Sequence, residues 1–297
     1  MSYYENNIAC IKEHDYKWEL YEAILKHEQD EDKITVSAKT TKTEDEALVI
    51  TLDGVEYNMA STYNPMAEAK RFIKPCEDID PRTQIFVVGF GNGVLARALL
   101  DMDKQKERYI FYEPSPESFR YVLHNYDIRD ILSNDKISLF VEGYNMTFFQ
   151  VWLTTKIRYV NWKLLYKLVV PKYYELYKDK TDEFIDRCEE MQFAGKAEQD
   201  TLVHFAEATM RNTVDNLKYL PFITTSADFM GRFDRDMPAI VVAAGPSLEK
   251  NVQELKRAKN KALIIAVDRA AVYLLNQGIT PDMVCTIDPQ KPIKMFE

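Results

Sequence analysis

The stretch from Ala239 to Gln290 constrains the fold of this chain more than any other part of it. Its first residues, Ala239–Ala243, form a short apolar run that is typical of a buried parallel strand. Gly245-Pro246-Ser247 interrupts that run, and Ser247 is a favourable N-cap for an amphipathic helix over Leu248–Lys259. The pattern predicts a strand, a sharp turn and a helix.

The same alternation continues downstream. A second apolar run covers Ala262–Val267, a helix is predicted over Ala270–Leu275 with Gly278 closing it, and a third strand is predicted over Val284–Ile287. Strands that alternate with helices in this way predict a right-handed parallel α/β unit.

Polar residues gather where these strands are predicted to end. They are Gly245-Pro246-Ser247, Asp268 and Asp288. Parallel sheets bind ligands beyond the carboxyl ends of their strands, and the start of a helix favours phosphate. The segment Ala244, Gly245, Pro246, Ser247 and Leu248 is therefore the candidate phosphate loop. Asp268 and Asp288 are candidates for holding a nucleotide, binding a metal or acting as a base; alternatively, they are only structural caps.

These residues resemble a known family. The resemblance is carried by Ala239–Leu248, Asn251, Leu263–Asp268, Gly278–Asp282 and Thr286–Pro289. They are similar to the start of the central, sialyltransferase-like domain of motility-associated factor (Maf) proteins, which are flagellin glycosyltransferases. The run Ser61–Ala69 also resembles the amino-terminal domain of Maf proteins. The Gly-Pro-Ser-Leu segment also resembles the nucleotide loops of CMP-sugar sialyltransferases and of archaeal hydroxymethylpterin diphosphokinases.

A second nucleotide-like unit lies upstream. A strand is predicted over Gln84–Val88, followed by the glycine-rich turn Gly89–Gly93 and a helix from Val94. The next strand ends on Glu113, which is placed to bind ribose hydroxyls. Val94 stands where a dinucleotide site needs glycine, so NAD is disfavoured. The favoured reading is a Rossmann-like scaffold without a ligand, and S-adenosylmethionine is disfavoured as a cofactor.

The remaining elements are predicted from periodicity and turn residues. A helix is expected over Tyr3–Lys26, a charged turn at Asp30–Lys33, a hairpin at Asp53-Gly54 and a helix over Pro65–Ile73 with Asn64 as its N-cap.

Two helical regions are expected further along. Asn145–Val169 is predicted to be mostly helical, with an aromatic face that includes Tyr159 and Trp162. Residues 171–219 predict a helical pair or bundle that Gly195 divides, and Pro221 is expected to end the last helix.

Composition excludes several classes of protein. The chain has 297 residues, of which 46% are hydrophobic, and a net charge of −9. The acidic balance argues against a general nucleic-acid surface. The scattered Cys10, Cys76, Cys188 and Cys285 fit thiols in the cytoplasm and show no zinc spacing. No apolar run is long enough to span a membrane.

The expected architecture is α/β with four parts: an α+β subdomain over 1–80, a Rossmann-like domain over 81–170, a helical connector over 171–236 and a nucleotide-binding domain over 237–297. The last part has too few predicted strands for its class, so we expect a fragment truncated inside the central domain.

The resemblance implies transfer of a nonulosonic acid (pseudaminic or legionaminic type) from a CMP-sugar to Ser or Thr of flagellin, in support of motility, with the fragment itself inactive. Asp268 and Asp288 are the catalytic candidates, and the metal requirement is left open. One alternative is pyrophosphoryl transfer to a pterin, with magnesium on Asp288. Another is a non-catalytic accessory protein that binds flagellin.

Overall fold

The computed structural model describes residues 2–13, 18–28, 33–102, 108–157, 164–224, 226–233 and 236–291. The chain divides into two compact units, Met1–Glu198 and Gln199–Glu297, each described here by itself. The charged turn predicted at Asp30–Lys33 falls largely outside the described residues, as do Tyr159 and Trp162.

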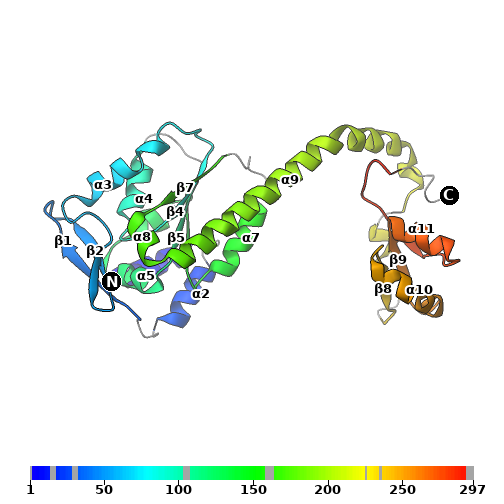
Figure 1. Ribbon diagram of the computed structural model, residues 1–297, viewed down its shortest axis with the longest axis horizontal. Coiled ribbons are helices and arrows are strands. Elements are labelled where there is room, and N and C mark those ends of the chain that lie inside the picture. The colour runs from blue at the N-terminus through cyan, green and yellow to red at the C-terminus, as the bar shows by residue number, and fades with distance from the viewer. Residues whose placement is uncertain are drawn as a thin grey trace. The chain divides into compact units, whose positions relative to one another are not determined.

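A four-stranded parallel sheet forms the centre of the first unit (Figure 1). Its strands, in the order β6-β5-β4-β7, are β4 (Gln84–Val88), β5 (Arg108–Glu113), β6 (Ile137–Val141) and β7 (Leu165–Val169). The connecting helices are α4 (Val94–Asp101), α5 (Pro116–Asn125), α6 (Arg129–Leu132) and α7 (Met146–Ile157). Every residue of β4 and β6 is buried, as expected for strands covered on both faces.

A smaller antiparallel sheet precedes this core. It comprises β1 (Thr35–Thr40), β2 (Glu46–Leu52) and β3 (Val55–Asn58), and is followed by α3 (Pro65–Phe72) and the short 3-10 turn η2 (Lys74–Cys76). The hairpin predicted at Asp53-Gly54 is confirmed, since both residues have positive φ, as a tight hairpin turn requires. Asn64 caps α3 by accepting a hydrogen bond from the amide of Ala67 at 2.8 Å.

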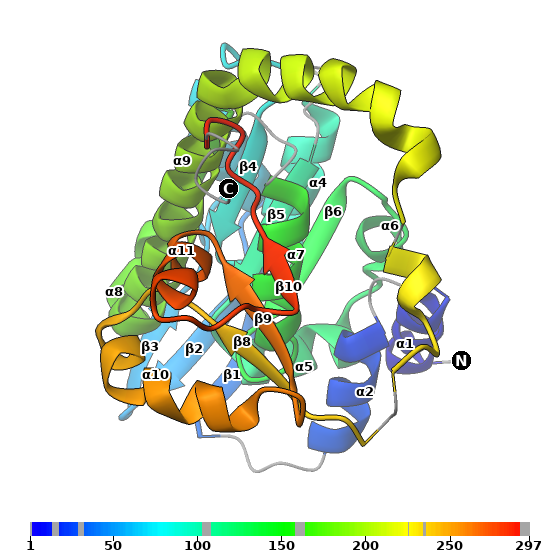
Figure 2. The ribbon, with the colours of Figure 1, turned by 90° about the vertical axis from the view of Figure 1, so that its right-hand side faces the viewer.

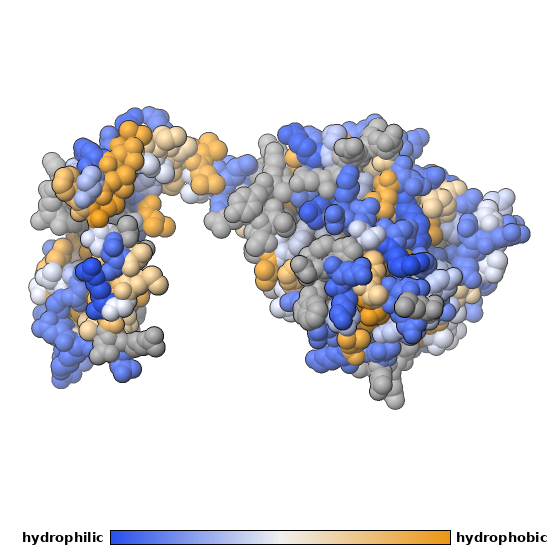
Figure 3. All heavy atoms as spheres, turned by 180° about the vertical axis from the view of Figure 1, so that it is seen from behind, coloured by the Kyte–Doolittle hydropathy of each residue, from blue (hydrophilic) through white to orange (hydrophobic). Residues whose placement is uncertain are grey.

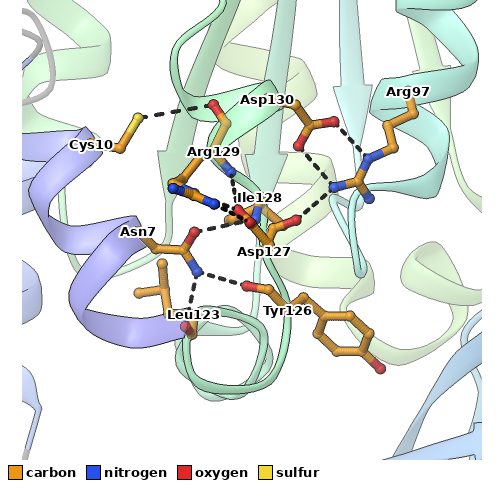
Figure 4. A network of polar contacts seen from close by, with 9 residues as sticks. All are labelled: Asn7, Cys10, Arg97, Leu123, Tyr126, Asp127, Ile128, Arg129 and Asp130. Atoms are coloured by element: carbon orange, nitrogen blue, oxygen red, sulfur yellow. Dashed lines mark hydrogen bonds and ion pairs between the residues drawn. The ribbon is translucent and has the colours of Figure 1, made fainter. Parts of the chain in front are cut away.

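Two helices, α1 (Tyr3–Lys12) and α2 (Trp18–His27), are described where periodicity predicts one, and residues 14–17 between them lie outside the described residues. Figure 4 shows how Asn7 joins α1 to the segment between α5 and α6. Its buried amide donates to the carbonyls of Leu123 at 3.0 Å and Tyr126 at 2.7 Å, and accepts from the amide of Ile128 at 3.2 Å. Such fully satisfied buried polar contacts fix one arrangement of the helices.

The helix predicted over Asn145–Val169 is wrong in its second half. The helical part is α7, whereas Leu165–Val169 is strand β7, paired in parallel with β4 from Gln84 to Val88. Pairing with a central strand satisfies the backbone of both strands and buries Leu168, and this tertiary contact outweighs the local helical pattern.

The helical pair predicted after residue 171 is also wrong. A short α8 (Pro171–Leu176) leads into one helix, α9 (Lys178–Asn216), whose 39 residues run through Gly195 without a break. One glycine costs a helix only about 1 kcal/mol, and pairs such as Arg187–Glu183 at i,i+4 support it. Pro221 lies inside the 3-10 helix η3 (Leu217–Phe222) that follows. The first unit ends at Glu198, which lies inside α9. The connector predicted over 171–236 is therefore divided between the two units.

The second unit contains a three-stranded parallel sheet in the order β10-β9-β8 (Figure 2). Its elements are η4 (Ser226–Phe229), β8 (Ala239–Val242), α10 (Pro246–Ala258), β9 (Leu263–Val267), α11 (Arg269–Asn276) and β10 (Met283–Cys285). The two helices share one core with the same face of the sheet, through Leu248, Leu274 and Ile264. The predicted strand-helix alternation from Ala239 onward is therefore confirmed.

The other face of this sheet carries apolar side chains without cover from the described residues of its own unit. Val241 is 68% exposed, although its neighbour Val242 is buried in the core. Figure 3 shows further hydrophobic side chains at the surface of this unit, and Met210, Val214 and Phe222 are among the exposed ones.

None of the described helices combines the length and the apolar character that crossing a membrane requires.

Candidate functional site

The turn after β8 places the start of α10 at the carboxyl-end rim of the second sheet. Gly245 is the N-cap and Pro246 the first helical residue, so the prediction that Ser247 caps the helix is wrong. Proline suits the first helical position because its ring fixes a helical φ and its missing N–H needs no partner there. Ser247 lies inside the first turn, and its amide N–H has no partner among the described residues.

Gly245 leaves the backbone of this turn accessible. Its φ of −105° is open to any residue, and a Cβ added there would meet nothing closer than the Ser247 Oγ at 3.9 Å. Neither backbone conformation nor packing therefore requires glycine at this position. The missing side chain keeps space open beside the amide of Ser247, where an anion can approach a helix N-terminus.

A cleft of about 600 Å³ opens beside this turn. It is bounded by the start of α10 and by α11, through Ala244, Gly245, Pro246, Leu248, Glu249, Arg269, Val272, Tyr273 and Asn276. Arg269 is exposed, and its guanidinium has no ion-pair partner among the residues that the structure describes. The cleft thus combines a helix N-terminus with an unpaired cation, as a site for a phosphate or carboxylate needs.

Asp268 lies at the end of β9, in a backbone conformation with φ of 45°. The Lys291 ammonium lies 2.8 Å from its Oδ1. Hydrogen bonds from Lys291 and from Thr286 hold the pKa of Asp268 below its usual value. The carboxylate is therefore ionised and already paired, which weakens it as a base and suits it to a positioning or binding role.

Asp288 follows β10, and its Oδ1 accepts a hydrogen bond from the amide of Gln290 at 3.0 Å. The amide of Asn212, on α9, donates to the carbonyl of Pro289 at 2.7 Å and anchors the same segment. Asn212 therefore fixes this loop to α9. Neither Asp268 nor Asp288 lines the cleft, although both follow strands that end at the same rim.

Among the described residues, no three or more His, Cys, Asp or Glu side chains come together in a way that could hold a metal ion. Arg269 and Lys291 are the residues of this region that sequence reasoning missed. Arg269 directly follows Asp268 at the start of a predicted helix, which was a usable signal. Nothing in the sequence indicated that Lys291 returns to Asp268.

The glycine-rich turn of the first unit has a different environment. The buried carboxylate of Glu113 accepts hydrogen bonds from the amides of Phe90 at 3.0 Å, Gly91 at 3.3 Å and Ser115 at 3.0 Å. The Tyr173 hydroxyl accepts a second bond from Gly91 at 3.0 Å. Burial raises the pKa of Glu113 to about 7, against the lowering effect of these hydrogen bonds. The amides that a phosphate would contact are thus taken by the protein itself.

Comparisons with known proteins find a family model, a sequence relative and a solved structure, and the family model falls within the second unit. A family model described as "6-hydroxymethylpterin diphosphokinase MptE-like" matches residues 211–296. An uncharacterized protein of Treponema pallidum (strain Nichols) is 33% identical over 95 residues, which cover 32% of this chain and 44% of that protein.

A solved structure, the Maf glycosyltransferase from Magnetospirillum magneticum AMB-1, is similar over 95% of this chain and 48% of its own, with 14% identity and a TM-score of 0.41. This chain matches less than half the length of either relative.

Proposed function

We propose that this protein is a glycosyltransferase whose second unit binds the phosphate of a CMP-activated nonulosonic acid and passes the sugar to Ser or Thr hydroxyls of flagellin. The observation that carries the proposal is the open start of α10, where Gly245, Pro246 and Arg269 line one cleft. The Arg269 guanidinium and the adjacent amide of Ser247 both lack a partner among the described residues. The resemblance of Ala239–Pro289 to Maf proteins supports the choice of substrates.

The chemistry explains why such a cleft is useful. In the transfer, the bond between the anomeric carbon and the phosphate oxygen breaks, the acceptor oxygen bonds to that carbon, and CMP departs as an anion. Helix amides and a guanidinium stabilise the charge that grows on the departing phosphate. A base must take the acceptor proton, and we assign that role to Asp288 because Asp268 is held by Lys291.

The cytoplasmic location stays a prediction.

A second candidate function is pyrophosphoryl transfer from ATP to a pterin. The match of residues 211–296 to the MptE-like family model favours it. In that reaction a magnesium ion would offset the charge of the phosphates. Asp288 would be its candidate ligand, because it is the carboxylate at the rim without a lysine partner among the described residues. The third alternative, an accessory protein that binds flagellin without catalysis, rests on no contact described here.

Nucleotide binding to the full chain separates these functions. We expect CMP to raise the melting temperature of the second unit, with ATP, ATP plus magnesium and S-adenosylmethionine giving smaller shifts. A response to ATP with magnesium alone would support pyrophosphoryl transfer, and no response to any nucleotide would support the accessory role.

A pair of arginine variants locates the binding. Arg269→Gln should weaken CMP binding about tenfold or more, since it removes a charge-assisted contact to phosphate. Arg257→Gln is the matched control, because Arg257 is also exposed but pairs with Glu254 on α10 at 3.0 Å. Equal effects of the two substitutions would place the nucleotide outside this cleft.

A further inference from the structure

The first unit contains a topological switch point that the proposed transfer does not use. From β4 the chain steps to β5 and β6 on one side, and it then returns to place β7 on the other side of β4. Open α/β sheets bind their ligands in the crevice that such a reversal leaves at the carboxyl-end rim. A cavity of about 440 Å³ lies there, lined in part by Gly89–Asn92 after β4 and by Val170–Tyr173 after β7.

The ring of Tyr173 fills the part of this crevice next to the glycine-rich turn. The residue is 2% exposed, and a Cβ added to Gly89 would lie 2.5 Å from the ring. The Tyr173 hydroxyl accepts from the amide of Gly91 at 3.0 Å and donates to the carboxylate of Glu113. The phenol thus lies between the cavity, which it lines, and a carboxylate that is buried behind it.

The contact between the Tyr173 hydroxyl and Glu113 is the one that a ribose makes in a nucleotide-binding sheet. There, a carboxylate at the end of the second strand accepts a hydrogen bond from a ribose hydroxyl. Glu113 holds that position at the end of β5. A ribose hydroxyl is both a donor and an acceptor, as the phenol hydroxyl is, so it can replace Tyr173 at both Glu113 and Gly91.

The surroundings suit a nucleoside better than a nucleotide. The amides of Phe90 and Gly91, which a phosphate would need, donate to Glu113 at 3.0 and 3.3 Å. The cavity beside the ring has mainly apolar walls, among them Met59 and Phe72, against which a base can be buried. Its volume lies within the usual range for small-molecule sites, which is about 300 to 1,000 Å³.

The helix that carries the ring has little else to hold it in the core. Tyr173 belongs to α8, whose six residues are Pro171–Leu176. All six are described, and Tyr173 alone among them is buried. Withdrawal of this ring therefore opens Glu113 to the cavity without uncovering another buried side chain of α8.

We propose that the crevice beside Glu113 is a nucleoside site that Tyr173 closes from within. The ribose takes the place of the phenol, with a hydroxyl on Glu113, and the base enters the apolar cavity. In the parent chain a nucleoside binds only when the ring has withdrawn, so its apparent affinity is reduced by the fraction of molecules that are open. The proposal requires no property of the cleft in the second unit.

Adenosine and 2′,3′-dideoxyadenosine form a matched pair of probes, because they share the base and the sugar ring and differ in the two ribose hydroxyls. Calorimetry on the full chain with Tyr173→Ala should show one adenosine site. Its affinity should be at least about 100-fold higher than in the parent chain, because the buried ring and its hydrogen bonds no longer compete with the ligand. The dideoxy compound should bind about tenfold more weakly than adenosine or worse, since its hydrogen bond to the carboxylate is lost.

Three further variants test the location. Tyr174→Ala, at an exposed position of the same helix, should bind adenosine no better than the parent chain. Adding Glu113→Gln to Tyr173→Ala should reduce the preference for adenosine over the dideoxy compound, because a neutral acceptor replaces a charged one. Tyr173→Leu keeps an apolar side chain in the core and serves in place of Tyr173→Ala if circular dichroism shows the latter to be unfolded. A folded Tyr173 variant that binds no adenosine, or that binds both nucleosides equally, would overturn the proposal.

Discussion

Replacing Glu113 with glutamine tests how the first glycine-rich turn is held. The carboxylate sits where three backbone amides converge, those of Phe90, Gly91 and Ser115. Two effects oppose each other there, because burial favours the neutral acid while the amides favour the anion. Glutamine cannot ionise, but its NH2 group cannot accept a backbone N–H, so the variant loses a hydrogen bond at every pH. The pH dependence of its stability relative to the parent chain therefore isolates the cost of ionisation.

The size of the stability change follows from the shift of the Glu113 pKa, because burial outweighs the hydrogen bonds there. Burial raises the pKa of Glu113 from 4.5 to about 7, and a pKa difference of one corresponds to about 1.4 kcal/mol. Since the folded pKa is the higher one, this stabilising contribution is complete below about pH 4.5 and is lost as the pH rises through 7. The first unit should therefore lose about 3 kcal/mol from this group between pH 4.5 and pH 8.

Urea unfolding at several pH values from 5 to 8 measures the effect. Tryptophan fluorescence reports the first unit alone, because residues 199–297 contain no tryptophan. Between pH 5 and pH 8, Glu113→Gln should gain about 2 to 3 kcal/mol of stability relative to the parent chain. Glu56→Gln, a control at an exposed carboxylate, should follow the parent chain at every pH. A Glu113→Gln variant that is less stable at pH 8 than at pH 5, relative to the parent, would show that the amides hold the carboxylate ionised and refute the reasoning.

Three further substitutions have definite expected outcomes. Gly89→Ala should destabilise the first unit by about 3 kcal/mol or more in urea unfolding, because φ is +101° there and the Tyr173 ring is in the way. Gly245→Ala should change the stability of the second unit by less than about 1 kcal/mol but weaken CMP binding in calorimetry. Asp288→Asn keeps the acceptor for the amide of Gln290, so it should leave CMP affinity intact while lowering the rate of sugar transfer about 100-fold or more.

Local patterns were sufficient to predict the fold wherever local and tertiary preferences agree. The strands after Ala239 and the hairpin at Asp53-Gly54 were predicted because apolar runs and turn residues coincide there. Leu165–Val169 was missed because its strand character comes from pairing with β4, which no local signal reveals. The single helix through Gly195 was missed because one glycine is a weak break when ion pairs support the helix on either side of it.

The candidate site was predictable only in part. The rule that ligands bind at strand ends placed Gly245, Asp268 and Asp288 at one rim, and the parallel sheet confirms that arrangement. The partners of these residues were not predictable, because Lys291 lies 23 positions beyond Asp268 in the numbering and reaches it only through the fold. Asn212 likewise reaches the carbonyl of Pro289 across 77 residues.

The turns after β4 and β8 both contain glycine, and each lies near a carboxylate at the end of the next strand. The two carboxylates differ in their binding partners. In the first unit Glu113, at the end of β5, takes the amides of the turn after β4. In the second unit Asp268, at the end of β9, pairs with Lys291, and the amide of Ser247 stays open. We therefore expect the turn of the second unit, where a cation holds the carboxylate, to accept an anionic ligand more readily than the turn of the first unit.

Lys291→Met tests this dependence, because it leaves an unpaired carboxylate at the rim where the phosphate is proposed to bind. CMP affinity measured by calorimetry should fall several-fold, and more at low salt, since like-charge repulsion is screened by ions. The loss should diminish as the pH falls toward the pKa of Asp268, which Lys291 no longer lowers. Lys250→Met, on an exposed part of α10, removes the same charge without uncovering Asp268. If both lysine variants lose affinity equally at every pH, the ion pair at Asp268 has no part in keeping the site open to anions.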